Sequence, residues 1–224
     1  MIKTINLKKI YRNEEIEVHA LKGINLEIFE GEMVSILGPS GSGKSTLLNC
    51  LSGIDKPTEG NVIIDGVDIT TLKDDELTNF RAQKMGFIFQ FFNLIPVLNA
   101  VENVELPLLV LGYSEKEARE LAEEMLVEVG LKDRMKNFPN MLSGGEAQRV
   151  AIARALVTKP KIVWADEPTG ALDTKTGMTI MNLIKELNEK NNQTFVIVTH
   201  DPRITEYTQR ILRMDSGLLV QNEG

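Results

Sequence analysis

A glycine-rich stretch near the N-terminal end sets narrow limits on how this chain folds: Gly38-Pro39-Ser40-Gly41-Ser42-Gly43-Lys44-Ser45. An apolar segment, residues 33–37, precedes it, and another, residues 46–51, follows. These are the strand and the helix that a phosphate-binding loop requires. Glycines let such a loop turn tightly and direct successive N–H groups toward phosphate oxygens. A chance glycine-rich turn would not need Lys-Ser at the start of a helix, so the stretch predicts binding of a nucleoside triphosphate.

The same stretch indicates how each part of the triphosphate would be held. The helix that we expect to begin at Thr46 directs the positive end of its dipole at the loop. Lys44 can reach the β- and γ-phosphates, and the Ser45 hydroxyl can ligate Mg²⁺.

Composition excludes several classes of protein. The 224 residues suffice for one domain with an ample core. Their net charge of −7, without a dense basic run, does not favour nucleic-acid binding. The single cysteine, Cys50, cannot form an internal disulfide and favours a structural apolar role. We see no signal peptide and no apolar run of about 18 residues, the length that spans a bilayer. These features predict a soluble protein of the reducing cytoplasm.

The apolar pattern predicts an α/β fold. Alternation at Ile24, Leu26 and Ile28 indicates a strand within residues 2–30, and Asp65-Gly66 is expected to join strands over 62–64 and 67–69. Four other segments are nearly all apolar, as in strands buried on both faces of a parallel sheet. They are residues 33–37, 86–89, 162–165 and 195–199.

Helices are expected between these strands. A capping box at residues 114–117 precedes a helical apolar stripe that Gly130 ends. A second stripe runs from Ile180 to Leu187. We therefore expect a single domain over residues 1–224, whose core (1–90 and 159–224) carries a helical insertion (91–158).

Each of the four buried strands is followed by a residue suited to phosphate chemistry. The first leads to Lys44, the second to Gln90, the third to Asp166-Glu167 and the fourth to His200. In open parallel sheets, ligands bind beyond the carboxyl ends of the strands. Four such residues at neighbouring strand ends therefore predict one site.

The residue types suggest a division of labour. Asp166 suits a contact with Mg²⁺, and Glu167, one position later, points elsewhere and can face an attacking water. An ordinary strand-end turn is the alternative for this pair. His200 could hydrogen-bond a γ-phosphate oxygen and hold Glu167, although a lone strand-end histidine is more often structural. The other histidine, His19, has no such neighbours in sequence.

The segment Leu142-Ser143-Gly144-Gly145-Glu146 precedes a helix expected over 147–157. Ser143 and Glu146 suit a capping box, which accounts for those two residues but not for the glycine pair. Exposed glycine amides at a helix start form a second anion-binding surface. One protomer should not need two, so we expect this surface to serve the nucleotide of another copy.

With these motifs in order, the chain resembles the ATP-binding-cassette (ABC) ATPases over essentially its full length. The resemblance rests on the Walker A loop (38–45), the Q-loop residue Gln90, the signature 142–146, the Walker B strand with Glu167, the D-loop residue Asp173 and the switch residue His200. It implies a P-loop NTPase fold with a mostly parallel core sheet, an N-terminal antiparallel β subdomain and a helical subdomain.

The resemblance also implies a dimer and a set of roles. Two copies would stack head to tail around two ATP molecules, each between one copy's Walker A loop and the other's Ser143, Gly144 and Gly145. Glu167, His200 and Gln90 would be catalytic, and Ser45, Gln90 and Asp166 would hold Mg²⁺. Tyr11 stands where the family places an aromatic residue that stacks on adenine, although a half-exposed strand tyrosine is the alternative. The further nucleotide-binding residues would be Gly38, Pro39, Ser40, Gly41, Ser42, Gly43, Lys44, Thr46 and Asp173.

Two positions depart from the family's pattern: Glu146 stands where glutamine is usual, and Gly170 where serine often leads the D-loop. Neither change removes a phosphate donor.

The segments 89–96 and 101–104 look like the branch that serves lipoprotein-release, macrolide-export and antimicrobial-peptide permeases. The dense apolar group at Phe91, Phe92, Leu94 and Ile95 is either core of the helical subdomain or a groove for a permease helix. For residues 106–111 we expect core.

These features predict an ATPase that dimerises on ATP and drives a separate membrane permease from the cytoplasmic face of the membrane, for export or extraction of a peptide, lipoprotein or amphipathic drug. The alternative is a cassette that transports nothing and transmits force to an extracytoplasmic cell-wall hydrolase. The soluble cassettes of DNA repair and translation carry a coiled-coil insertion or two cassettes per chain, and neither is present here. A guanine-specific GTPase is disfavoured because no N-K-x-D segment occurs.

Overall fold

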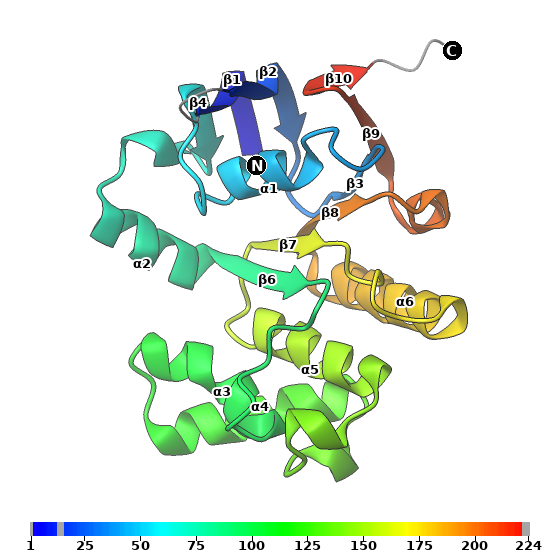
Figure 1. Ribbon diagram of the computed structural model, residues 1–224. Helices are drawn as coiled ribbons and strands as arrows, with labels where there is room; N and C mark the ends of the chain where they lie inside the picture. The colour runs from blue at the N-terminus through cyan, green and yellow to red at the C-terminus, as the bar shows by residue number, and fades with distance from the viewer. Residues whose placement is uncertain (1, 13–15, 221–224) are drawn as a thin grey trace. The chain divides into compact units, whose positions relative to one another are not determined.

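The computed structural model describes residues 2–12 and 16–220. The chain divides into two compact units, residues 1–81 with 194–224 (unit 1) and residues 82–193 (unit 2). Helix α2 (Asp74–Lys84) runs across the boundary between them. Figure 1 shows the elements of both units.

Unit 1 contains a four-stranded antiparallel sheet in the order β2-β1-β4-β5. Its strands are β1 (Ile2–Arg12), β2 (Glu17–Ile28), β4 (Glu59–Ile64) and β5 (Val67–Asp68). Ile24, Leu26 and Ile28 are buried, as their alternation predicts. This sheet confirms the expected N-terminal antiparallel subdomain.

Ile69 does not extend β5 as expected, because the Asp68 side chain accepts a hydrogen bond from the Thr70 N–H and starts the short 3₁₀ helix η1 (Ile69–Thr71).

The second set of strands in unit 1 is mostly parallel. β3 (Met33–Leu37) pairs in parallel with β8 (Thr194–Thr199) on one side and with β9 (Arg210–Asp215) on the other. β10 (Leu218–Val220) closes this set antiparallel to β9, and the 3₁₀ helix η4 (Pro202–Tyr207) lies between β8 and β9 in the chain. All residues of β3 and β8 are buried, which confirms the prediction from their continuous apolar sequence.

Unit 2 pairs β6 (Met85–Phe89) in parallel with β7 (Ile162–Asp166). Three of its helices, α3 (Ala100–Val110), α4 (Glu115–Glu128) and α5 (Gly144–Leu156), lie together in Figure 1. The other elements are η2 (Lys132–Arg134), η3 (Pro139–Met141) and α6 (Thr174–Asn191). Ser114 and Glu117 form the predicted capping box of α4, and the expected apolar stripe of α6 is buried.

Residues 106–111 are only partly core, contrary to expectation. Leu108 is 1% exposed, whereas Val110 is 70% exposed. A helix at the edge of a bundle buries one face, so an all-apolar sequence places some side chains in solvent.

Among the described residues, no helix combines the length and apolar character that crossing a bilayer requires.

Candidate functional site

The phosphate loop of unit 1 needs glycine at particular positions. Gly43 adopts φ 100°, and a Cβ there would lie 2.5 Å from the Ala20 carbonyl oxygen. A Cβ on Gly38 would lie 2.2 Å from the Met214 carbonyl oxygen, so this position excludes any side chain for lack of space. The loop therefore depends on glycine for conformation at one end and for close backbone approach at the other.

Helix α1 (Lys44–Leu51) begins two residues earlier than predicted, directly after the left-handed Gly43. No side chain caps its first turn, and that turn contains no acidic residue. The helices α3, α4, α5 and α6 are capped by Asn99, Ser114, Ser143 and Asp173. The first N–H groups of a helix need partners, and an anion at this end also meets the favourable end of the dipole. The start of α1 thus has the chemistry of a phosphate site.

Lys44 and Ser42 place two further polar groups in the loop. Lys44 is 7% exposed, and its Nζ donates to the Pro39 carbonyl oxygen at 2.9 Å, so the ammonium lies across the loop that we expect to hold phosphate. The Ser42 hydroxyl is buried without a hydrogen-bond partner. Buried polar groups normally have partners, so this hydroxyl also fits a loop that receives a polar ligand.

Tyr11 lies on β1, in the same unit as the phosphate loop, and is 43% exposed. Its hydroxyl donates to Asp55 Oδ2 at 2.8 Å. Burial raises the pKa of Tyr11, the Asp55 carboxylate raises it further, and a hydrogen bond with Thr46 opposes them. Thr46 is in the first turn of α1, so the Tyr11 side chain lies next to the phosphate-loop helix.

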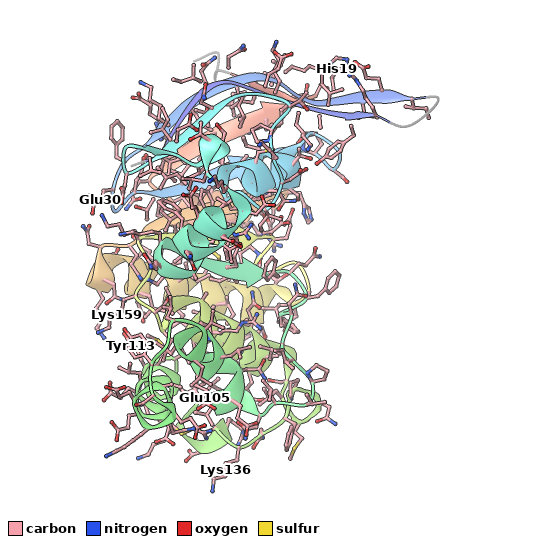
Figure 2. All side chains as sticks on the ribbon, turned by 90° about the vertical axis from the view of Figure 1, so that its left-hand side faces the viewer. His19, Glu30, Glu105, Tyr113, Lys136 and Lys159 are labelled. Carbon is pink, nitrogen blue, oxygen red and sulfur yellow. The ribbon has the colours of Figure 1, made fainter. Side chains whose placement is uncertain are left out.

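The strand ends come together in pairs within each unit. In unit 1 Leu37 is opposite Thr199, so the phosphate loop and His200 leave the same edge of the sheet. In unit 2 Phe89 is opposite Asp166, so Gln90 and Glu167 follow at the same edge. His19, by contrast, lies on β2 (Figure 2). Its Nε2 is 2.9 Å from Glu17 Oε1 on the same strand.

The loop that carries Glu167 is fixed by hydrogen bonds inside unit 2. Glu167 adopts φ 48°, a conformation that costs free energy for a residue with a side chain. Its carbonyl oxygen accepts from the Gly170 N–H at 2.9 Å. Gln148 of α5 is fully buried and donates from Nε2 to the Pro168 carbonyl oxygen at 2.6 Å.

Gln90 lies against this same loop, because a Cβ on Gly170 would be 2.8 Å from its Nε2. The glycine that departs from the family's usual serine therefore makes room for Gln90.

The signature segment begins α5 at Gly144, three residues before the predicted start, because Ser143 is the N-cap. The predicted capping box is present: the Ser143 hydroxyl accepts from the Glu146 N–H, and Glu146 accepts from the Ser143 N–H at 2.8 Å. Arg134 pairs with the other Glu146 oxygen at 2.8 Å. The hydrogen bond from the Ser143 backbone and then Arg134 hold the pKa of Glu146 below its ordinary value. Arg134 thus offsets the charge that Glu146 brings to the signature.

Asp173 caps α6 by accepting from the Thr176 N–H at 3.0 Å. Hydrogen bonds from the Thr176 side chain and then from its backbone lower the pKa of the Asp173 carboxyl. A Cβ on Gly145 would lie 2.7 Å from Thr176 Cγ2. The signature glycine and the start of α6 are therefore neighbours inside unit 2.

Arg154 of α5 is a residue that the sequence analysis missed. It donates from Nη1 to the Asn93 carbonyl oxygen at 2.5 Å and from Nη2 to the Phe92 carbonyl oxygen at 2.7 Å. Phe92 and Asn93 both have positive φ, and they directly follow Gln90 and Phe91. One guanidinium therefore fixes two left-handed residues. An arginine within residues 150–157, which are otherwise apolar, is the signal that could have pointed to it.

We expect Arg154→Met to lower the free energy of unfolding by about 2 kcal/mol, because two carbonyl groups lose charge-assisted hydrogen bonds. Chemical denaturation of the variant and the parent chain gives the difference. Lys185→Met is the control, since Lys185 makes a 4.0 Å ion pair within α6 that should be worth little. Equal stability of both variants would contradict this role of Arg154.

Comparisons with known proteins agree with this geometry. Residues 21–170 match the model of the family described as ABC transporter. The ABC transporter ATP-binding protein MJ0796 of Methanocaldococcus jannaschii is 53% identical over 227 residues, which cover 100% of this chain and 97% of that protein. A solved structure of it, described as a dimeric post-hydrolysis state bound to ADP and Pi, has a TM-score of 0.90 to this chain, with 52% identity over 99% of this chain and 97% of that one.

Two relatives have names that include a process. The lipoprotein-releasing system ATP-binding protein LolD of Legionella pneumophila is 48% identical, with 97% of this chain and 96% of LolD covered. The macrolide export ATP-binding/permease protein MacB of Rhodopirellula baltica is 46% identical over 99% of this chain, but only 33% of MacB is covered. The fold, the phosphate loop and these matches lead to one conclusion: the chain belongs to the ABC transporter family and is an ATP-binding, ATP-hydrolysing cassette of that family.

Proposed function

We propose that this cassette works as a head-to-tail dimer that encloses two ATP molecules and drives a separate membrane permease. One observation carries the proposal: the chain has two helix starts that are suited to anions. One is the start of α1 in unit 1, and the other is the start of α5 in unit 2, with its glycine pair. The second surface would bind the nucleotide held by the phosphate loop of the other copy, through Ser143, Gly144 and Gly145. The dimeric form of the relative MJ0796 supports this arrangement.

In the proposed site, residues 38–46 bind the phosphates, Tyr11 stacks on adenine, and Asp166 and Asp173 complete the nucleotide contacts. Ser45, Gln90 and Asp166 supply a hydroxyl, an amide carbonyl and a carboxylate, and such oxygen donors fit Mg²⁺. A bound Mg²⁺ ion would neutralise charge on the β- and γ-phosphates.

For hydrolysis, we assign Glu167 as the base that orients the attacking water and accepts its proton. His200 donates a hydrogen bond to a γ-phosphate oxygen, and Gln90 senses whether that phosphate is present. The fixed loop around Glu167 supports this assignment, because a base must be held in place to act on one water molecule.

The permease would contact the segment after Gln90. Phe91 is 72% exposed and Val97 is 78% exposed, and none of residues 91–97 is buried, which favours the groove over the core among the two readings of this apolar segment. The names of LolD and MacB, which refer to lipoprotein release and macrolide export, support export or extraction of a lipoprotein, peptide or amphipathic drug. Beside such a permease, the cassette would lie on the cytoplasmic face of the cell membrane.

A site-specific cross-link tests this partner. Cys50, the only cysteine, is buried, and desolvation raises the pKa of its thiol to about 12, so it should not react with a maleimide. A Phe91→Cys variant, labelled with a photoactivatable maleimide in native membranes, is expected to cross-link to an integral membrane protein, which mass spectrometry then identifies.

The matched control is Val110→Cys, which has a similar exposure at the end of α3 in the same unit. Capture of the same membrane protein from both positions, or from neither, would contradict docking at the Gln90 segment. If the captured permease is bound to a cell-wall hydrolase, force transmission to that hydrolase would replace transport as the proposed function.

A further inference from the structure

The Tyr11 side chain is tied to two charged residues, Lys9 of β1 and Asp55 of the loop after α1. The Tyr11 hydroxyl donates to Asp55 Oδ2 at 2.8 Å, and Lys9 Nζ donates to Asp55 Oδ1 at 2.6 Å. The Lys9 ammonium also lies over the Tyr11 ring, 4.9 Å from its centroid. One carboxylate therefore holds the tyrosine by its hydroxyl and holds the cation that covers one face of its ring.

The carboxylate in this network is ionised at neutral pH. Burial alone would raise the pKa of Asp55, but hydrogen bonds from Lys9 and Tyr11 outweigh it and bring the pKa below its ordinary value. The Lys9 side chain is 13% exposed, so this ion pair is better shielded from water than an ordinary surface pair.

The same loop makes further hydrogen bonds to β1. Lys9 Nζ donates to the Lys56 carbonyl oxygen at 2.8 Å, and the Thr58 N–H donates to the Lys8 carbonyl oxygen at 2.8 Å. The Thr58 hydroxyl accepts from the Ile10 N–H at 3.0 Å. Since the loop follows α1, whose first turn borders the phosphate loop, the strand that carries Tyr11 is linked to the phosphate site within unit 1.

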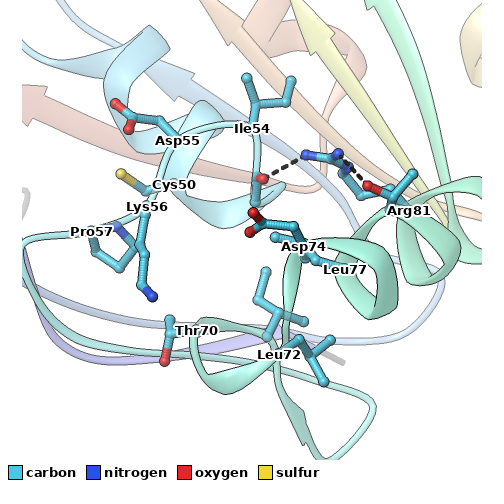
Figure 3. A pocket seen from close by; sticks show the side chains of 13 residues that line it. Cys50, Ile54, Asp55, Lys56, Pro57, Thr70, Leu72, Asp74, Leu77 and Arg81 are labelled. Carbon is cyan, nitrogen blue, oxygen red and sulfur yellow. Dashed lines mark hydrogen bonds between the residues drawn. The ribbon is translucent and has the colours of Figure 1, made fainter.

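Packing alone does not hold Asp55. It lines a cavity of about 210 Å³ together with residues such as Asp74 and Arg81, whereas Lys9 and Tyr11 are not part of that lining. In Figure 3 its carboxylate points away from Asp74 and Arg81. With open space on one side, Asp55 is held by hydrogen bonds from Lys9, Tyr11 and the Lys56 backbone.

We propose that Asp55 and Lys9 are positioning residues for the nucleobase. They hold the Tyr11 ring in one orientation, with the ammonium against one face, and leave the other face to a purine base. The inference rests on the proposed stacking role of Tyr11. A ring that is ordered before binding loses less side-chain entropy when the base arrives, so removal of the tether should weaken ATP binding.

Two ligands separate base binding from phosphate binding: ATP and inorganic tripolyphosphate, each titrated in competition against a fluorescent ATP analogue. Asp55→Ala is expected to weaken ATP binding about threefold to tenfold, and to leave tripolyphosphate binding unchanged. The KM for ATP should rise by the same factor, while the hydrolysis rate at saturating ATP is kept. Asp55→Asn, which keeps an oxygen acceptor for Tyr11 but no charge for Lys9, should give a smaller loss.

Asp74→Ala is the matched control, because Asp74 lines the same cavity from α2 and has no bond to Tyr11. It is expected to change the binding of neither ligand. In a Tyr11→Ala chain, Asp55→Ala should cause no further loss of ATP binding, since no ring remains to be positioned.

Equal weakening of ATP and tripolyphosphate by Asp55→Ala would overturn the proposal, because Asp55 would then support the phosphate loop and not the ring. Unchanged ATP binding in Asp55→Ala, with a loss in Tyr11→Ala, would overturn the positioning role and leave stacking intact. Unchanged ATP binding in Tyr11→Ala would refute stacking itself and, with it, this inference.

Discussion

A Glu167→Gln variant is expected to bind ATP as the parent chain does. Its hydrolysis rate should be at most about one hundredth of the parent rate. The amide has nearly the shape of the carboxylate but cannot accept the proton of the attacking water. The loop around Glu167 is fixed by Gln148 and by its own Gly170 turn, so the exchange should not disturb the backbone. Phosphate release at saturating ATP gives the rate.

The same variant should accumulate as a dimer in ATP, because the proposed dimer is opened by hydrolysis. Size-exclusion chromatography with light scattering, with ATP in the running buffer, distinguishes dimer from monomer. Glu128→Gln is the control: it makes the same chemical change on α4, where the carboxylate pairs with Lys190 at 2.6 Å. A Glu167→Gln chain that hydrolyses ATP at the parent rate would remove Glu167 from its role as base.

Lys44→Met is expected to weaken ATP binding by about 10- to 100-fold, the loss that one to two charge-assisted hydrogen bonds to phosphate would cause. Methionine keeps the apolar stem and the helix propensity but places no charge over the loop. In Lys44→Met, hydrolysis should fall together with ATP binding, whereas in Glu167→Gln hydrolysis should fall while ATP binding is kept.

Isothermal titration with ATP measures the affinity of the Lys44→Met variant. Lys22→Met on β2 removes the same charge from unit 1 at an exposed position and should leave affinity within twofold. If the two variants bind ATP equally well, the Lys44 ammonium does not contact the phosphates.

Features encoded over a few consecutive residues were predictable from sequence. The capping boxes of α4 and α5 each need only two residues three positions apart, and both are present. The buried strands β3 and β8 follow from runs that are apolar on both faces. The family resemblance likewise rests on short motifs, and the comparison with the family model confirms it.

Contacts between distant residues were not predictable. The Tyr11–Asp55 hydrogen bond joins residues 44 positions apart, and the Arg154–Asn93 bond joins residues 61 apart. Neither pair has a local pattern, because polar side chains in a loop or on a helix are ordinarily solvated. Helix α1 begins at Lys44 and not at the predicted Thr46 for a related reason: apolar periodicity does not mark a first turn that begins with lysine and serine.

The pairing of β6 with β7 sets how this protein tolerates insertions and deletions. Phe89 is opposite Asp166 at the end of this pairing. A shift of the pairing by one residue would change which residue ends β7 and which residue follows it. Successive side chains of a strand point to opposite faces, so the loss of a single residue inside β7 would move Glu167 to the place of Asp166 and Asp166 to the place of Ala165. During evolution, length changes should therefore be confined to the connections between elements, whereas the interior of β7 accepts substitutions only.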